Sequence, residues 1–305
     1  QNVLRCVRPA AAVLTRFDCL LQRTAMAVKS LEEVVQLLGE NAEVSVVGRT
    51  AFMVAAERAL ESEREDALFV DPYGKALSGQ DGLAMSDRLG EAACQFGFDN
   101  WPEFHKVWTV VRTKFIDDVL SAVCGVQQMV NLGAGVDTRP YRLDIYKEFK
   151  ASFEVDTTEV NAVRSAFFTH NAAKSLCPVL NVSADFCKRG MLAEKLSEAG
   201  YEHQVPSVFL IEGVLDFLEE SAEPFLHEVS QLAAPGSIAV INYAIGPQRP
   251  GTFTSDALLN LLEDLGWKDC QIDVFGGERL NYGRYKEGLA PSKDWAFATC
   301  VKGQG

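Results

Sequence analysis

The sequence lacks the cysteine and histidine patterns of a metal-binding or disulfide-rich protein. None of its eight cysteines are paired in C-x-x-C spacing. It has only four histidines, none of them at metal-binding spacing: His105, His170, His203 and His227. A catalytic metal would have to be held mostly by carboxylates, and we expect none. Scattered thiols of this kind are typical of reduced cysteines in a cytosol-like compartment.

The chain also lacks positive charge and long apolar runs. Its formal net charge of -13 and its pI near 4.9 oppose binding to phosphate backbones and to anionic lipid headgroups. No apolar run approaches the ~18 residues that would span a membrane. At 48% hydrophobic and 23% charged residues, the composition is that of a globular protein. The sequence therefore predicts a soluble protein without nucleic-acid or membrane partners.

Composition and hydrophobic pattern divide the chain into three predicted parts. Residues 1–27 carry four arginines against a single acid. A remnant of organelle targeting and a translated upstream segment explain this bias about equally well, so a cytoplasmic location is expected with an organelle left open. Residues 28–125 favour helices throughout and predict a helical cap. Residues 126–305 predict the core.

Three segments of the predicted cap carry helical patterns. SLEEVVQLL at residues 30–38 has serine and glutamate in capping-box spacing. RTAFMVAAERALESERED at residues 49–66 repeats apolar positions at helical spacing and is rich in strong helix formers. Residues 102–124 repeat the pattern up to Gly125. We expect the second helix to be broken by Asp71 and the proline after it.

After Gly125 the texture changes to short apolar strands alternating with helices, which is the signature of a parallel sheet built from βαβ units. The predicted strands are Gln128 to Leu132, Ser152 to Asp156, Pro178 to Ser183, Val208 to Glu212, Ser237 to Tyr243, Cys270 to Phe275 and Trp295 to Val301. The helices named between them are Thr158 to Asn171, Leu192 to Ala199 and Ser255 to Leu265. The fold class is therefore α/β, with a seven-stranded, Rossmann-like sheet.

The most informative motif is QMVNLGAGVDTRPYRL at residues 128–143. It joins a buried strand to a turn with Gly133 and Gly135, where the missing Cβ atoms let backbone approach a ligand. In an open parallel sheet, ligands bind beyond the carboxyl ends of the strands, where this turn is expected. Asp137 and Thr138 stand where the dinucleotide fingerprint continues to its third glycine. Its absence argues against NAD.

Acidic residues follow the next strands. Asp156 ends the second strand just over 20 residues after the glycine turn, the spacing at which an acid accepts hydrogen bonds from ribose hydroxyls. Glu154 shares its face of the strand and is an alternative as a structural acid. Asp185 and Glu212 follow later strands. Such acids would repel nucleotide phosphates, so they favour a nucleoside cofactor without phosphate.

A cation is also needed if that cofactor ends in an amino-acid carboxylate. Arg112, in VVRTKFIDDVL just before the core, can form a bidentate pair with it. Without a family comparison, a solvated helix face shared by Arg112, Asp117 and Asp118 is the simpler interpretation.

Taken together, these motifs resemble the leucine carboxyl methyltransferase-like family of S-adenosylmethionine-dependent O-methyltransferases. The matching segments are GRTAFMVAAERALE, LFVDPYG, VRTKFIDD, VNLGAGVDTRPYRL, FEVD, SADF, LIEGVLDFL and LEDLGW, with a later Gly-Arg pair. They span residues 48 to about 300 in the family's order. The resemblance implies a class I methyltransferase fold with an antiparallel last strand, a helical cap and S-adenosylmethionine as cofactor.

The resemblance also implies roles for single residues. Arg112 would bind the cofactor's carboxylate, and Glu212 would lie near its amine. Asp156 would hold the ribose, and Asp185 with Phe186 would line the adenine. With the glycine turn under the methionine part and the cap reaching in, the predicted cofactor-binding residues are Arg49, Thr50, Arg112, Gly133, Ala134, Gly135, Asp137, Asp156, Asp185, Phe186 and Glu212.

The implied reaction is in-line displacement on an activated methyl group, for which the protein aligns the acceptor and excludes water. A carboxylate acceptor needs no general base, whereas a hydroxyl or thiol benefits from one, and the candidates are Tyr73, His105, His170 and Tyr243. We expect O-methylation of a small-molecule carboxylate or hydroxyl by a monomer or homodimer. S-methylation of a thiol or thioether, protein C-terminal carboxyl methylation and non-catalytic cofactor binding remain alternatives.

Overall fold

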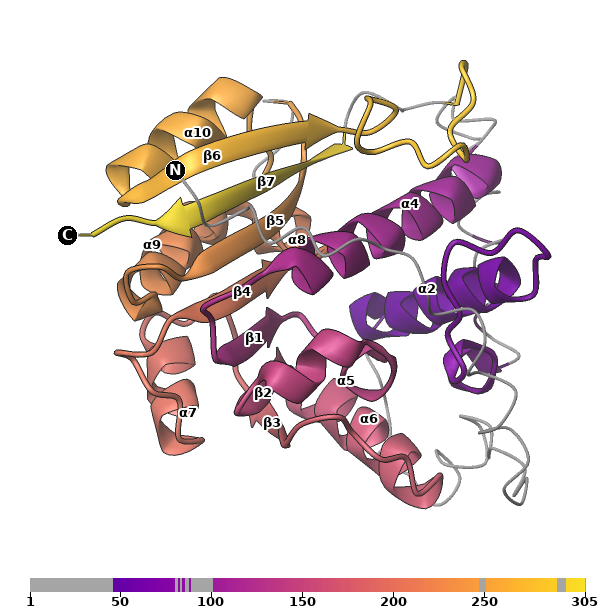
Figure 1. The fold of residues 1–305 in the computed structure, drawn as a ribbon, viewed down its shortest axis with the longest axis horizontal. Coiled ribbons are helices and arrows are strands. Elements are labelled where there is room, and N and C mark those ends of the chain that lie inside the picture. Colours follow the sequence, from indigo (N-terminus) through magenta and orange to yellow (C-terminus); the bar gives the residue numbers. More distant parts are fainter. Residues whose placement is uncertain are drawn as a thin grey trace.

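A computed structural model of the protein describes residues 46–79, 101–246, 251–289 and 295–304, and also residues 82, 84, 85 and 88. Within them, the strands form one seven-stranded sheet in the order β3-β2-β1-β4-β5-β7-β6. The strand order reverses between β1 and β4, the switch point beside which ligands bind in open α/β sheets. Figure 1 shows helices on both faces of this sheet. The predicted α/β class is confirmed.

All seven predicted strands are present. Their bounds are β1 (Gln128–Leu132), β2 (Ala151–Asp156), β3 (Val179–Ser183), β4 (Ser207–Ile211), β5 (Ile238–Ala244), β6 (Trp267–Val274) and β7 (Trp295–Lys302). The first five strands pair in parallel, and β7 runs antiparallel between β5 and β6, which confirms the expected antiparallel last strand. The strand β6 begins earlier than predicted, at Trp267, and carries an irregularity between Lys268 and Gln271.

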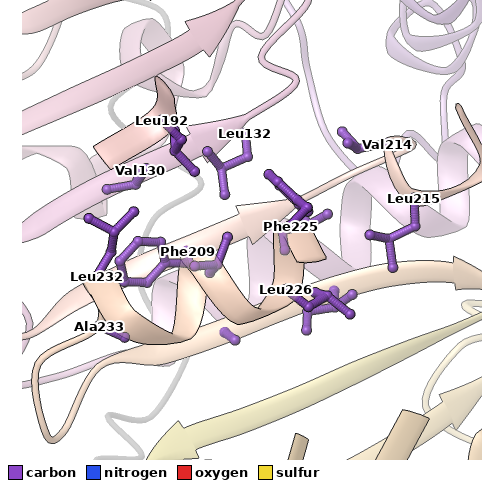
Figure 2. Packing of buried hydrophobic residues seen from close by; sticks show 14 of the residues in the cluster. Val130, Leu132, Leu192, Phe209, Val214, Leu215, Phe225, Leu226, Leu232 and Ala233 are labelled. Atoms are coloured by element: carbon purple, nitrogen blue, oxygen red, sulfur yellow. The ribbon is translucent and has the colours of Figure 1, made fainter. Parts of the chain in front are cut away.

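One face of the sheet is covered by α7 (Met191–Glu198), α9 (Ala222–Leu232) and α10 (Ser255–Asp264). Figure 2 shows the strand residues Leu132 and Phe209 of this cluster packed among side chains of α7 and α9. Fully burying one such side chain stabilises the fold by about 1.5–3 kcal/mol. The buried residues of this cluster all come from β1 and the segments that follow it.

The opposite face is covered by α4 (Trp101–Ala122), whose Trp108 and Phe115 pack against Leu210 of β4 and Phe297 of β7. The short α5 (Arg139–Arg142) and the 3-10 helix η3 (Asp144–Glu148) follow β1. The helices α2 (Val46–Ser62) and α6 (Thr158–His170) share a further apolar cluster. Figure 1 shows α2 and the first half of α4 lying beyond the carboxyl ends of β1 and β4.

One predicted helix of the cap ends earlier in the structure than expected. The helix expected over residues 49–66 ends at Ser62, because Glu61 and Ser62 turn their side chains to the chain that follows: they accept hydrogen bonds from the backbone N–H groups of Leu68 and Asp71, each at 2.9 Å. These side-chain to backbone hydrogen bonds therefore end the helix before Pro72 is reached. The predicted helix at 30–38 and the segment 1–27 lie outside the described residues, and the three-part division of the chain stays a prediction.

Candidate functional site

The ends of four neighbouring strands lie at one level. In the parallel register, Leu132 of β1 is opposite Val155 of β2 and Ile211 of β4, so the next residues, Gly133, Asp156 and Glu212, come side by side. Ile211 is in turn opposite Ile241 of β5, which adds Asn242 to the row. The side-chain amide oxygen of Asn242 accepts a hydrogen bond from Gly213 N at 3.1 Å. The sheet therefore brings these residues together at the switch point.

The turn after β1 requires glycine. Gly133 and Gly135 have φ of 77° and 51°, in the left-handed region that L-residues avoid. A Cβ atom on Gly133 would lie 2.3 Å from Cγ2 of Val214, which follows β4. The N–H groups of Gly133 and Ala134 both donate to Val155 O, and Gly135 N donates to Oδ2 of Asp156 at 2.7 Å. The turn is thus a tight backbone cradle tied to the end of β2.

Arg112 lies on α4 against this cradle and is almost fully buried, with 8% of its surface exposed. Its Nε lies 2.8 Å from Oε1 of Glu212, but within the described residues this buried Nε has no acceptor in hydrogen-bonding geometry. Its Nη1 faces Gly213, at 3.7 Å from where a Cβ there would stand. Burial lowers the pKa of Arg112, partly offset by the charges of Glu212 and Glu57. A buried cation with a donor left over fits a ligand carboxylate.

Glu212 is shared between two arginines. Its Oε2 accepts a hydrogen bond from Arg139 Nη1 at 2.9 Å, and the same guanidinium binds Asp137 at 2.7 Å and Asp117 at 2.8 Å. Arg142 also binds Asp117, at 2.6 Å. Although burial opposes the charged form of Arg139, these carboxylates raise its pKa well above the usual value. The network fixes the carboxylate of Glu212 beside the cradle.

Asp137, predicted to bind the cofactor, has both oxygens engaged within the protein. One accepts from Arg139 N at 2.8 Å, and the other accepts from Arg139 Nη1 and from Asn131 Nδ2 at 3.0 Å. Burial would raise its pKa, but Arg139 outweighs burial and lowers it. Asn131 also donates to Glu154, whose pKa burial raises. This geometry favours a supporting role for Asp137, and its contact with a cofactor stays a prediction.

The predicted ribose and adenine residues lie along the same edge. Burial raises the pKa of Asp156, against the hydrogen bonds that it accepts from Gly135 N and Thr157 N. Asp185 follows β3 and is exposed, with Oδ1 accepting from Cys187 N at 3.0 Å. The ring of Phe186 packs 4.9 Å from that of Phe225 on α9. Their positions beside the end of β2 suit a nucleoside, and their ligand roles stay predictions.

The cap reaches this edge through α2. A Cβ on Gly135 would lie 3.2 Å from Cβ of Ala51, so the start of α2 lies against the turn. Thr50 is half-buried next to Ala51, while the side chain of Arg49 lies outside the described residues. Further along α2, Arg58 binds Asp71 at 2.8 Å and donates to Val136 O at 3.0 Å. These contacts hold α2 over the glycine turn.

A second buried acid on α2 faces α4. Both oxygens of Glu57 lie within hydrogen-bonding distance of Nδ1 of His105, at 3.0 and 2.9 Å, and Oε2 also accepts from Thr109 Oγ1 at 2.6 Å. His105, Thr109 and Arg112 follow one another at four- and three-residue intervals on one face of α4, so the pair lies on the same side of the helix as the predicted cofactor cation.

The other predicted bases lie elsewhere. Tyr73 packs among the rings of Tyr141, Phe167 and Phe168, and burial raises its pKa. His170 ends α6, which runs back from the end of β2 toward the opposite edge of the sheet, and its Nδ1 binds Ala166 O. Tyr243 is buried on the sheet face away from α4, with its hydroxyl 3.0 Å from Ser255. Of the four, His105 is the one on the face of Arg112.

Several residues of the site were not singled out in the sequence. Arg139, Asn131 and Asn242 support Glu212 and the turn, and Glu57 and Arg58 anchor α2. A polar residue inside an otherwise apolar strand, as at Asn131 and Asn242, is a signal that sequence can give, because a buried amide requires partners. Glu57 contacts His105, which is 48 residues away in the chain, and Arg58 contacts Val136, which is 78 residues away. No local pattern points to them.

Within the described ranges, no group of three or more histidine, cysteine or acidic side chains is placed to hold a metal ion. The same ranges contain no helix that is long and apolar enough to cross a membrane. The residues at the strand ends do fit the cofactor that the resemblance implies. A buried arginine with an unused donor suits its carboxylate, Glu212 suits its amine, and the cradle around Gly133 has no room for a Cβ.

Comparison with known proteins supports the same cofactor. A sequence model of the family described as leucine carboxyl methyltransferase matches residues 51–228. A Streptomyces avermitilis protein is 35% identical over 210 residues, covering 65% of this chain and 69% of that protein. One from Streptomyces coelicolor is 36% identical over 205 residues, covering 63% and 68%. The names of both assign them to the S-adenosyl-L-methionine-dependent methyltransferases.

Among solved structures, that of a DUF574 family protein from Streptomyces avermitilis superposes with a TM-score of 0.53. It covers 81% of this chain and 96% of its own at 14% sequence identity, which shows a shared fold.

Proposed function

Because the chain belongs to the leucine carboxyl methyltransferase family and is an S-adenosylmethionine-dependent methyltransferase, we propose that it methylates an oxygen atom, a carboxylate or a hydroxyl, of a small molecule. The observation that carries the proposal is the placing of Arg112 and Glu212 as an opposed charge pair beside the glycine cradle. That pair matches the two charges of an amino-acid tail. It thereby directs the rest of a bound cofactor along the edge of the sheet.

The protein's contribution to the reaction is alignment and exclusion of water. When bound, the cofactor supplies a methyl group that its sulfonium charge has already activated. Arg112 would bind the tail carboxylate, Glu212 the amine and Asp156 the ribose hydroxyls. The helices α2 and α4 lie beyond the strand ends and would wall off solvent from the acceptor. Holding two reactants in line in this way supplies much of the rate enhancement of such transfers.

Charge supports a small acceptor over a nucleic acid. The net charge of -13 repels phosphate backbones, whereas a metabolite of low charge meets no such barrier. A carboxylate oxygen attacks without a base, and for a hydroxyl oxygen His105 is a candidate base on the face of α4 that carries Arg112. For the chain as a whole, a monomer or homodimer is part of the proposal.

The test is transfer of label from S-adenosylmethionine carrying a labelled methyl group to a filtered small-molecule extract. We expect labelled products of low mass. Alkali then separates the two oxygen classes, because methyl esters release labelled methanol whereas methyl ethers and thioethers keep the label; mass spectrometry then distinguishes ethers from thioethers. Arg112→Met serves as the control for transfer that depends on the site. Label found only in protein, or only on sulfur, would contradict the proposal.

A further inference from the structure

Glu57 and His105 form a largely buried hydrogen-bonded pair that cofactor binding does not explain. Glu57 is 1% exposed, and the His105 side chain is 15% exposed. The pair joins α2 to α4, two helices outside the sheet. Glu57 is 48 residues before His105 in the chain and 52 residues before Thr109. Burying a carboxylate is costly in free energy unless it is paired, so the buried Glu57 depends on its contacts with His105 and Thr109.

The environment of the pair determines which of the two groups carries the shared proton. Burial alone would raise the pKa of Glu57, but His105, the hydroxyl of Thr109 and the charge of Arg112 outweigh it and lower the pKa. An ionised carboxylate has no proton to donate, so Nδ1 of His105 must be the donor. In the neutral imidazole, the other nitrogen, Nε2, then carries the lone pair.

The pair also lies in the right part of the site. Arg112 is at the level of the strand ends, beside Glu212 and Gly213. His105 precedes it by seven residues, two turns, on the same face of α4, which places its backbone about 10 Å along the helix axis toward the start of α4. Figure 1 shows this first half of α4 running past the strands beside α2. An acceptor bound on this outer side of a cofactor tail at Arg112 would lie near His105.

The charges around the pair come from three elements. On α4, Arg112 contributes to the low pKa of Glu57, and Glu103 pairs with Lys286 at 3.8 Å. On α2, Glu61 is held by Arg284 of the segment after β6, at 2.7 Å. These outer carboxylates are neutralised by their own partners. Glu57 is therefore the carboxylate that acts directly on His105.

We propose that the acceptor is a hydroxyl compound, that His105 is the catalytic residue that accepts its proton, and that Glu57 is a positioning residue. The proposal rests on the function proposed above. As the acceptor oxygen forms its bond to the methyl carbon, the carbon–sulfur bond breaks and its electron pair stays on sulfur. The hydroxyl proton passes to Nε2 of His105 and then to solvent, so the enzyme returns to its starting state.

The variant His105→Asn tests the catalytic role while sparing the fold. Asparagine keeps an N–H that can reach Glu57, but it has no basic nitrogen. We expect the rate of ether formation to fall by about 10²- to 10⁴-fold. The affinity for S-adenosylhomocysteine and the melting temperature should stay near those of the wild type. The matched control is His170→Asn on α6, for which we expect no change in rate.

The variant Glu57→Gln separates positioning from simple support. The amide oxygen of glutamine can still accept from Nδ1, but the negative charge is gone. We expect the rate of ether formation to fall in Glu57→Gln while the affinity for S-adenosylhomocysteine stays near that of the wild type, because the imidazole that accepts the proton no longer has an anionic partner. A purely structural contact would lower the affinity for S-adenosylhomocysteine together with the rate.

A second measurement needs no acceptor. Nitrogen NMR of the imidazoles in the complex with S-adenosylhomocysteine reports the tautomer of His105, assigned with the His105→Asn variant. We expect the neutral imidazole to carry its proton on Nδ1. A proton on Nε2 would overturn the role of His105.

The outcomes for the two proposals differ. Failure of the wild type to label any small molecule would count against the proposed function, and the NMR result would still decide the protonation of His105. If the products are methyl esters, or if His105→Asn makes ether at the wild-type rate, the hydroxyl proposal fails while oxygen methylation stands.

Discussion

Replacing Arg112 by methionine should weaken binding of S-adenosylhomocysteine through the tail carboxylate alone. The guanidinium is buried beside the glycine cradle, and its Nε has no hydrogen-bond acceptor within the described residues. A hydrogen bond to a charged group contributes about 1.5–3 kcal/mol, so loss of the cation should cost about 2–3 kcal/mol of binding free energy. This is a weakening of roughly 30- to 160-fold.

The assay is calorimetry with two ligands. S-adenosylhomocysteine carries the amino-acid tail, and 5′-methylthioadenosine has the same nucleoside and sulfur without it. We expect Arg112→Met to lose affinity for the first ligand and to bind the second as the wild type does. Equal losses for both ligands would show that the substitution disturbs the whole pocket, and no loss for the first would remove Arg112 from the carboxylate site.

Two controls protect this comparison. Lys114→Met removes a cation from the same helix that is paired with Asp118, and it should leave both affinities unchanged. The fold of Arg112→Met should survive, because Glu212 keeps its bond to Arg139. Thermal unfolding with and without S-adenosylhomocysteine tests this, since a folded variant that binds weakly shows a smaller ligand-induced rise in Tm.

Further predictions concern stability and binding. Gly133→Ala should destabilise the fold by about 1–3 kcal/mol in urea unfolding, because its φ is 77° and the new methyl would meet Val214. Asp156→Ala should weaken S-adenosylhomocysteine binding by about 1–3 kcal/mol in calorimetry, and an unchanged affinity in a folded variant would remove it from the site. Arg139→Met should cost about 3–5 kcal/mol of unfolding free energy, because it strands buried carboxylates. Glu57, whose folded pKa lies below the ordinary 4.5, should stabilise the protein fully above that pH and progressively less as pH falls through the folded value. The stability difference between wild type and Glu57→Gln should therefore shrink on acidification, and a constant difference would contradict the lowered pKa.

The central strands of the core could be predicted from the sequence because β1, β4 and β5 are buried along their whole length. The segments from β1 to β5 are nearly continuous apolar runs bounded by polar residues or glycine, a pattern that few other structures share. The strand β6 is exposed along much of its length, so Lys268 and Asp269 concealed its beginning at Trp267. The helix α9 and the short α8 (Leu215–Leu218) before it were not named, because the apolar run out of β4 hides where the strand ends and the helix begins.

The site was predictable where register determines it. Gly133, Asp156 and Glu212 each follow a parallel strand, and parallel strands that start together end together. The placing of Arg112 needed the family resemblance, because a helix before the sheet has no register with it. The contact of Glu57 with His105 depends on how two such helices cross, and this is set by tertiary packing alone.

Charge balance explains why this cradle suits a zwitterion. Around it, Arg112, Arg139 and Arg142 face three carboxylates of Glu212, Asp137 and Asp117. A ligand tail with one carboxylate and one amine can interpose itself between Arg112 and Glu212 and leave every charge paired. A pyrophosphate would add negative charge to a buried site whose arginines are already largely engaged, at a large desolvation cost. The same balance that lets the apoprotein bury these groups therefore selects an uncharged nucleoside with an amino-acid tail over a dinucleotide.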